Sequence, residues 1–219
     1  MALPAAALET PLRRSINAAF HNAIAALTLS FVGTLALLPL VTIGFALLGV
    51  VHAMRVILAR GSPHTARQTV GLFIDGVRTH LVQGAGLSAL IWLLVGLVGG
   101  NLLMLTGTVP FLVRLVALLS LTAALIGLCA LPYIVVVTDA AESLRTGVRD
   151  GVVLAVQNLR YTILLDLVLA SLLVLGVLTM VGWALIGFGF AAVLTLVGTN
   201  LLYQQAGGRS IISYSAPAE

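Results

Sequence analysis

The side chains best placed for chemistry are a few ionisable and amide groups inside otherwise apolar segments. Asp166 is the most informative, because it interrupts the apolar run YTILLDLVLAS. In lipid a carboxylate costs roughly 2.5–3.5 kcal/mol on insertion scales, so it requires a partner or water. Five further polar residues are expected at a similar depth, in the inner third of predicted membrane helices: His21, His52, Arg55, Gln83 and Asn200. Together the six predict a polar layer near the cytoplasmic side.

Two interpretations of this layer stay open. In the first, the six groups form a substrate or proton site within the helix bundle. In the second, the predicted helix ends are displaced by one turn and the same groups lie among lipid headgroups. Asp166 is about 9 Å and His52 about 12 Å from the inner boundary at roughly 1.5 Å per residue. The first interpretation therefore predicts that Asp166 pairs with His52 or Arg55.

The usual sequence signatures of catalysis do not occur in the chain. There is no nucleotide-binding loop, no HExxH motif, no serine nucleophile elbow and no pair of catalytic carboxylates. The four histidines lie in different segments, so their spacing predicts no metal site. Cys129 is the single cysteine, which excludes an intrachain disulfide. We therefore expect a protein that is not an enzyme and that uses no cofactor or metal.

The composition places the protein in a membrane. Of the 219 residues, 60% are hydrophobic and only 8% are charged, and the mean hydropathy is +1.16. A soluble domain has about 25% charged residues, so this chain has too little polar surface for water. The basic residues are all arginine and fall at predicted helix ends, which fits anionic lipid headgroups and argues against nucleic acid.

Turn residues divide the chain into helices. Pro39, Gly61 with Pro63, and Pro110 interrupt apolar runs that would each be too long for one crossing of about 20 residues. The predicted fold is a single all-α domain, an integral membrane bundle of six transmembrane helices with two cytoplasmic amphipathic surface helices. The spans are residues 16–38, 41–59, 80–104, 110–137, 161–181 and 182–203, and the surface helices are residues 63–79 and 139–158.

The arginines predict the topology. Ten of the eleven fall in the N-terminal segment, the inner helix ends, the surface helices or the tail, and only Arg114 lies on the other side. Six crossings with both termini in the cytoplasm place all ten inside, as the positive-inside rule requires. This predicts a multi-pass protein of the cytoplasmic membrane.

Local patterns add three further predictions. Asp139 and Glu142 resemble a capping box that starts the second surface helix. Gly96 and Gly100 form a GxxxG pair that would let another helix approach closely, although glycine is also common in membrane helices generally. An offset of about 82 residues aligns Arg67 with Arg149, which suggests a weak internal repeat of span, surface helix and span; coincidence between two basic amphipathic helices explains it as well.

Two stretches resemble the YesL family of bacterial membrane proteins. The first is LPLVTIG with the arginine-bearing helix that ends in Arg60-Gly61, and the second is Phe73-Ile74-Asp75-Gly76-Val77-Arg78. The chain departs from the family where Phe45 replaces the usual proline after the motif glycine. The resemblance implies a cytoplasmic-membrane protein without established activity, sometimes associated with carbohydrate uptake systems, and it implies no catalytic residues.

Two functions are therefore carried forward. The first is a non-enzymatic accessory or scaffold subunit beside a solute transporter, with the lipid bilayer, transporter subunits or a cytoplasmic protein as partners. The second is a small transporter or the substrate-binding membrane subunit of an uptake system. The sequence does not indicate a substrate or an oligomeric state.

The predicted topology can be tested with cysteine labelling in intact cells. Cysteine introduced at Ser62, Thr146 or Ser213 is expected to resist membrane-impermeant thiol reagents, because all three positions are predicted to be cytoplasmic. The parent chain, which carries only Cys129, gives the background. Labelling of Thr146→Cys from outside the cell would overturn the topology.

Overall fold

The computed structural model describes residues 21–37, 39, 41–60, 65–107, 110–141, 143–179, 187–205 and 211–212. Within these ranges the regular secondary structure is entirely helical, which confirms the all-α prediction. The helices are α2 (Ala23–Leu37), α3 (Ile43–Arg60), α4 (Ala66–Thr79), α5 (Leu81–Thr106), α6 (Phe111–Ala140), α7 (Leu144–Gln157), α8 (Leu159–Thr179) and α9 (Phe188–Gln205).

Among the described residues, fewer helices are suited to cross a membrane than the six predicted. Three of the described helices, α3, α5 and α6, are long and apolar enough, and a fourth crossing results if the bent pair α7–α8 is one span. Helix α2 has 15 residues, about 22 Å at 1.5 Å per residue, against a hydrocarbon core of about 30 Å. Residues 16–20 and 180–186, which belong to the predicted first, fifth and sixth spans, lie outside the described residues.

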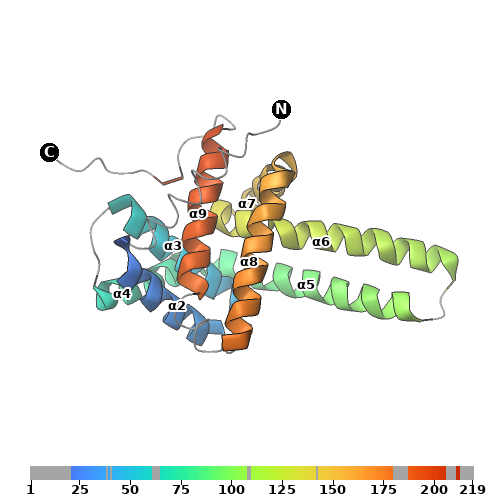
Figure 1. The fold of residues 1–219 in the computed structure, drawn as a ribbon, viewed down its shortest axis with the longest axis horizontal. Coiled ribbons are helices and arrows are strands. Elements are labelled where there is room, and N and C mark those ends of the chain that lie inside the picture. The colour runs from blue at the N-terminus through green and yellow to red at the C-terminus, as the bar shows by residue number, and fades with distance from the viewer. Residues whose placement is uncertain are drawn as a thin grey trace.

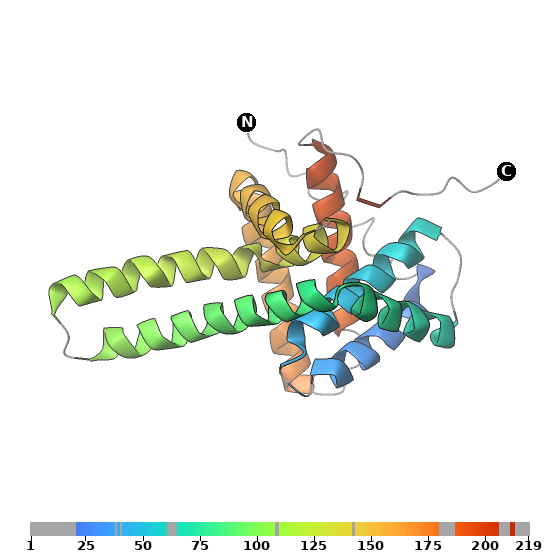
Figure 2. The ribbon, with the colours of Figure 1, turned by 180° about the vertical axis from the view of Figure 1, so that it is seen from behind.

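The helices do not form six parallel rods. Helices α5 and α6 make a long hairpin that projects sideways, while α8 and α9 run across its direction (Figure 1). The outer part of the hairpin lies away from all the other helices (Figure 2). The buried core lies at the opposite end, where α3, the inner half of α6 and α9 together contribute most of the buried side chains.

The two helices of the α5–α6 hairpin are joined by a hydrogen bond between polar side chains in an apolar region. Asn101 Nδ2 of α5 donates a hydrogen bond of 2.9 Å to Ser120 Oγ of α6, and Asn101 is buried. Polar side chains that bond across helices in this way fix the register of apolar pairs, at about 0.6–2 kcal/mol each. The hairpin register is therefore specified even where few other side chains surround it.

The two amphipathic helices fold back along the longer helices that precede them. In α4, Thr65 is the N-cap and forms a capping box with Gln68. In α7 the N-cap is Ser143, whose hydroxyl accepts a hydrogen bond from the Thr146 N–H. The prediction that Asp139 caps this helix was wrong, because α6 continues as far as Ala140.

The two amphipathic helices correspond at an offset of 78 residues, which differs from the predicted 82 residues. Thr65 corresponds to Ser143 as N-cap, and His80 corresponds to Asn158 at the end of the amphipathic helix, both 78 residues further along the chain. His80 has φ −111° and ψ 32°, and Asn158 has φ −116° and ψ 41°. At this offset Arg67 corresponds to Arg145 rather than to Arg149, one helical turn from the predicted alignment. A repeat of span, surface helix and span stays a prediction.

Glycines allow α7 to lie directly on α6. A Cβ atom at Gly151 would lie 2.8 Å from both Cα and N of Ile134, and a Cβ at Gly147 would lie 2.8 Å from Cα of Thr138. These neighbours are backbone atoms and cannot rotate away. Because α6 carries Asp139 one residue beyond Thr138, this close contact also holds the end of α6 that forms the candidate site.

A pair of glycine substitutions tests this packing. Gly151→Ala is expected to lower the free energy of unfolding by roughly 1–3 kcal/mol, because the new methyl group forces α6 and α7 apart. The control is Gly96→Ala on α5, where a Cβ meets nothing within 4 Å; this change should be neutral or stabilising by up to about 1 kcal/mol. Thermal unfolding in mild detergent measures both. Equal stability of the two variants would contradict the close contact.

Candidate functional site

The candidate site is built around Asp139 in the last turn of α6. Its side chain is fully buried, with 0% exposure, although Ala140 is the last residue of the helix. The carbonyl groups at a helix C-terminus carry partial negative charge, so a carboxylate at this position is destabilising unless cations or hydrogen-bond donors offset it. The residues around Asp139 supply both.

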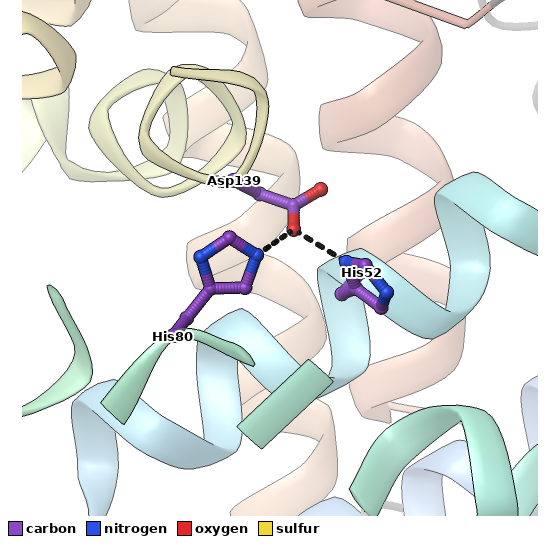
Figure 3. A group of neighbouring side chains, drawn as sticks. All are labelled: His52, His80 and Asp139. Carbon is purple, nitrogen blue, oxygen red and sulfur yellow. Dashed lines mark hydrogen bonds and ion pairs between the residues drawn. The ribbon is translucent and has the colours of Figure 1, made fainter. Parts of the chain in front are cut away.

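Three side chains from two other parts of the fold converge on this carboxylate. His52 and Arg55 lie one turn apart on α3, and His80 lies at the junction of α4 and α5. His52 Nδ1 is 2.9 Å and His80 Nε2 is 3.1 Å from Asp139 Oδ1. Figure 3 shows the two imidazoles meeting at the same carboxylate oxygen. The second oxygen, Oδ2, lies 2.9 Å from Nε of Arg55.

The two histidines share one acceptor, which fixes their protonation pattern. Each nitrogen that hydrogen bonds to a carboxylate oxygen must carry a hydrogen. A neutral His52 is therefore the Nδ1–H tautomer and a neutral His80 the Nε2–H tautomer. The remaining nitrogen of His80, Nδ1, is buried and has no hydrogen-bond partner among the described residues. Such a buried, unpaired polar atom costs about 1–3 kcal/mol.

Arg55 balances the charge of the cluster. Its Nε atom forms an ion pair with Asp139 Oδ2, but no donor among the described residues makes a well-aligned hydrogen bond to that oxygen. The Arg55 side chain is 24% exposed and the Asp139 side chain is not exposed at all. With both histidines neutral, the cluster carries no net charge, which is the state with the lowest desolvation cost for a buried group of this kind.

Chemically, the cluster can hold a charge, exchange a proton or bind a cation. Imidazole is a common proton-transfer group in proteins. The same three ligand atoms, one each from His52, His80 and Asp139, all lie within 4.8 Å of one another. Imidazole and carboxylate are also the ligands that many transition metals prefer.

The prediction that Asp166 pairs with His52 or Arg55 was wrong. Both of those side chains contact Asp139, whereas Asp166 lies near the Cys129 thiol of α6. Asp166 Oδ2 is buried without a hydrogen-bond partner among the described residues. Depth in the membrane could not distinguish the two carboxylates, because the pairing depends on which helix packs against α3.

The other residues of the predicted polar layer have separate surroundings. Asn200 of α9 is buried, and its Oδ1 accepts hydrogen bonds from the backbone N–H groups of Ile211 and Ile212 at 2.8 and 3.2 Å. Gln83 of α5 is half-buried, and His21 is exposed at the start of the described chain. Only His52 and Arg55 of the six are shown to converge on one group, so a single polar layer of all six stays a prediction.

The predicted helix-packing pair has no partner within the part of the chain that the structure describes. A Cβ atom at Gly96 or at Gly100 would meet nothing within 4 Å. No described helix therefore packs closely against either glycine. That packing stays a prediction.

Sequence analysis missed Asp139 and His80 as members of a site. Asp139 was interpreted as a helix cap because an acidic residue and a glutamate follow the apolar run at the capping-box spacing. His80 was interpreted as the start of a span. The sequence does contain a usable signal, because Ser143 also fits an N-cap. A second surface helix that begins after Ser143 leaves Asp139 in the preceding helix, α6.

Comparison of the chain with protein-family models, with curated proteins and with solved structures gives no match. The assignment of a role therefore depends on the geometry of the chain itself.

A double-mutant cycle tests the pairing of Asp139 with Arg55. Arg55→Gln should lower the free energy of unfolding by about 3 kcal/mol or somewhat less, because it leaves a buried carboxylate without its full charge partner. Combined with Asp139→Asn, the loss should be clearly smaller than the sum of the two single losses. The control cycle pairs Arg55→Gln with Asp166→Asn, which should be additive. Coupling to Asp166 with additivity at Asp139 would contradict the structure.

Proposed function

We propose that this protein is a multi-pass membrane protein that acts as a non-enzymatic accessory subunit, in association with a membrane partner such as a solute transporter. The observation that carries the proposal is the exposed apolar hairpin α5–α6. Leu103, Phe111 and Leu112 are 75%, 77% and 72% exposed near its tip. Apolar surface of this extent on a soluble protein would cause association, and here it requires lipid or the helices of another protein.

The surfaces beside the hairpin support attachment to a membrane face. Helices α4 and α7 pack their apolar sides on the core and leave exposed arginines on the other side, namely Arg67, Arg78, Arg145 and Arg149. Basic amphipathic helices of this kind bind anionic headgroups or acidic protein surfaces at the cytoplasmic side. The positive-inside rule gives the same side, and both chain ends then lie in the cytoplasm.

The number of crossings forms a separate part of the proposal. The hairpin provides two crossings and α3 a third, and the distribution of arginines favours six. For six, α2, α8 and α9 have to align with the hairpin across the bilayer. The resemblance to the YesL family, which implies a membrane protein sometimes associated with carbohydrate uptake, supports the same accessory role.

The cavities of the described structure also support a role in assembly. A cavity of about 140 Å³ lies between α3, α6, α8 and α9, and a groove of about 360 Å³ lies between α2, α3 and α4. Both are lined almost entirely by apolar side chains, which suit acyl chains or helix side chains. Small polar substrates require converging polar groups in their pockets.

A second candidate function is a small transporter or a substrate-binding membrane subunit. The observation that favours it is the buried cluster of Asp139, His52, His80 and Arg55. Ionisable groups buried between the helices of a membrane protein commonly mark ion or proton pathways. In this case the cluster would bind and release a proton or an ion during transport.

Affinity purification in mild detergent followed by mass spectrometry separates the two candidates. The accessory role predicts that transporter subunits co-purify, and that Leu103→Asn with Leu112→Asn on the hairpin reduces their recovery severalfold. The control is Ile74→Asn on α4, an exposed apolar residue outside the hairpin. Purification of the chain alone, with a small molecule whose retention depends on Asp139, would replace the accessory role with the transport role.

A further inference from the structure

We propose that His52, His80 and Asp139 form a binding site for a divalent transition-metal ion of the Zn²⁺ type. The ligand atoms are Nδ1 of His52, Nε2 of His80 and Oδ1 of Asp139. This inference goes beyond the accessory role and does not depend on it, because it is drawn only from the three side chains and their immediate surroundings.

The spacing of the three atoms fits a common ion. Ligands at about 2.0–2.2 Å from zinc are separated by roughly 3.3–3.6 Å in a tetrahedral site. The two nitrogen–oxygen distances are 2.9 and 3.1 Å, and all three atoms lie within 4.8 Å of one another. For an ion to enter, the two nitrogen–oxygen distances have to lengthen by roughly 0.2–0.7 Å.

The ligand types select the class of metal. Two imidazole nitrogens and one carboxylate oxygen suit zinc, copper, nickel or iron, whereas magnesium and calcium prefer sites made of oxygen atoms. Three protein ligands leave at least one position for water or another ligand. Structural zinc sites usually have four protein ligands, so this arrangement corresponds to a site with an open position.

The surroundings hold the ligands in position. Each ligand comes from a different element: α3, the α4–α5 junction and the last turn of α6. The imidazole rings meet edge to face, with centroids 5.5 Å apart and planes at 62°. One nitrogen of each ring points at the same oxygen of Asp139 (Figure 3). Arg55 contacts Oδ2 of Asp139 and leaves Oδ1 for the shared ligand position. Outer contacts of this kind orient the ligands of metal sites.

The other ring nitrogen of His80 is a further feature of the cluster. His80 Nδ1 is buried without a hydrogen-bond partner among the described residues, whereas Asp139 Oδ2 is ion-paired with Arg55. Because Nδ1 is not the proposed ligand atom, it leaves Nε2 as the nitrogen of His80 that faces the ion position. When an ion binds, the proton of each neutral imidazole moves from the coordinating nitrogen to the other one. No net proton release is needed, because Asp139 is already ionised in its pair with Arg55.

The alternative is a cluster held by hydrogen bonds alone, and metal titration of the full-length protein decides between the two. The protein is purified in mild detergent through a tag without histidine, treated with a chelator and titrated with Zn²⁺. We expect one ion per chain at micromolar concentration. If the chelator-treated parent protein takes up no stoichiometric Zn²⁺, the site does not exist, whatever the variants do.

Substitutions show whether the bound ion uses these three residues. His80→Gln, His52→Gln and Asp139→Asn should each weaken Zn²⁺ binding by at least about 10-fold. His21→Gln is the matched control, because His21 lies on the exposed start of the described chain, and it should bind as the parent does. Gel filtration and helical circular dichroism check that each variant is folded. Unchanged binding in folded His80→Gln would assign the ion to another place and overturn the proposal.

A measurement on the parent chain makes the test independent of how the variants fold. Cu²⁺ is loaded in place of Zn²⁺, and pulsed electron paramagnetic resonance counts the imidazole nitrogens coupled to it. Two imidazoles per ion are expected, because His52 and His80 are the only histidines brought together among the described residues. A spectrum with no imidazole, or with one, would overturn the site.

Discussion

The arrangement of the core depends on one electrostatic constraint, the burial of the Asp139 carboxylate at the C-terminal end of a helix. Neither the low-dielectric surroundings nor the helix carbonyls favour a negative charge at that point. The carboxylate is kept in place because Arg55 and two imidazoles approach it from α3 and from the α4–α5 junction. Three separate segments of the chain are thereby tied to one side chain, so a change in the packing of any of them changes the cluster.

The amphipathic helices explain how His80 reaches that position. Helix α4 packs against α3, with Gly76 lying on the His52 ring at a distance that leaves no room for a side chain. Helix α4 then ends at His80, whose backbone N–H still donates a hydrogen bond to Gly76 O. Helix α7 ends in the same way at Asn158, whose backbone N–H donates a hydrogen bond to Leu154 O. The two amphipathic helices thus end in the same junction geometry, and only the first of them places an imidazole there.

Some parts of the fold and of the candidate site could be predicted from the sequence and others could not, for physical reasons. Apolar length and breaking residues indicated the helices closely: α3 and α5 begin within two residues of the predicted positions at 41 and 80. Helix direction was not predictable, because apolar composition specifies burial in lipid but not which helices lie parallel. The site was only half found. His52 and Arg55 were identified from their depth, but their partner depends on a contact between α3 and α6, and local patterns carry no information about contacts so distant along the chain.

The distance along the chain between the members of the cluster affects the order in which the protein is made. His52 and Asp139 are separated by 87 residues, which a ribosome adds in roughly 4–17 s at about 5–20 residues per second. For nearly all of that interval Arg55 is already synthesised and Asp139 is not. Helix α3 is therefore complete well before the carboxylate that compensates its arginine exists. Closure of the cluster has to wait for the end of α6, so the packing of α3 around Asp139 is a late step in the synthesis of the chain.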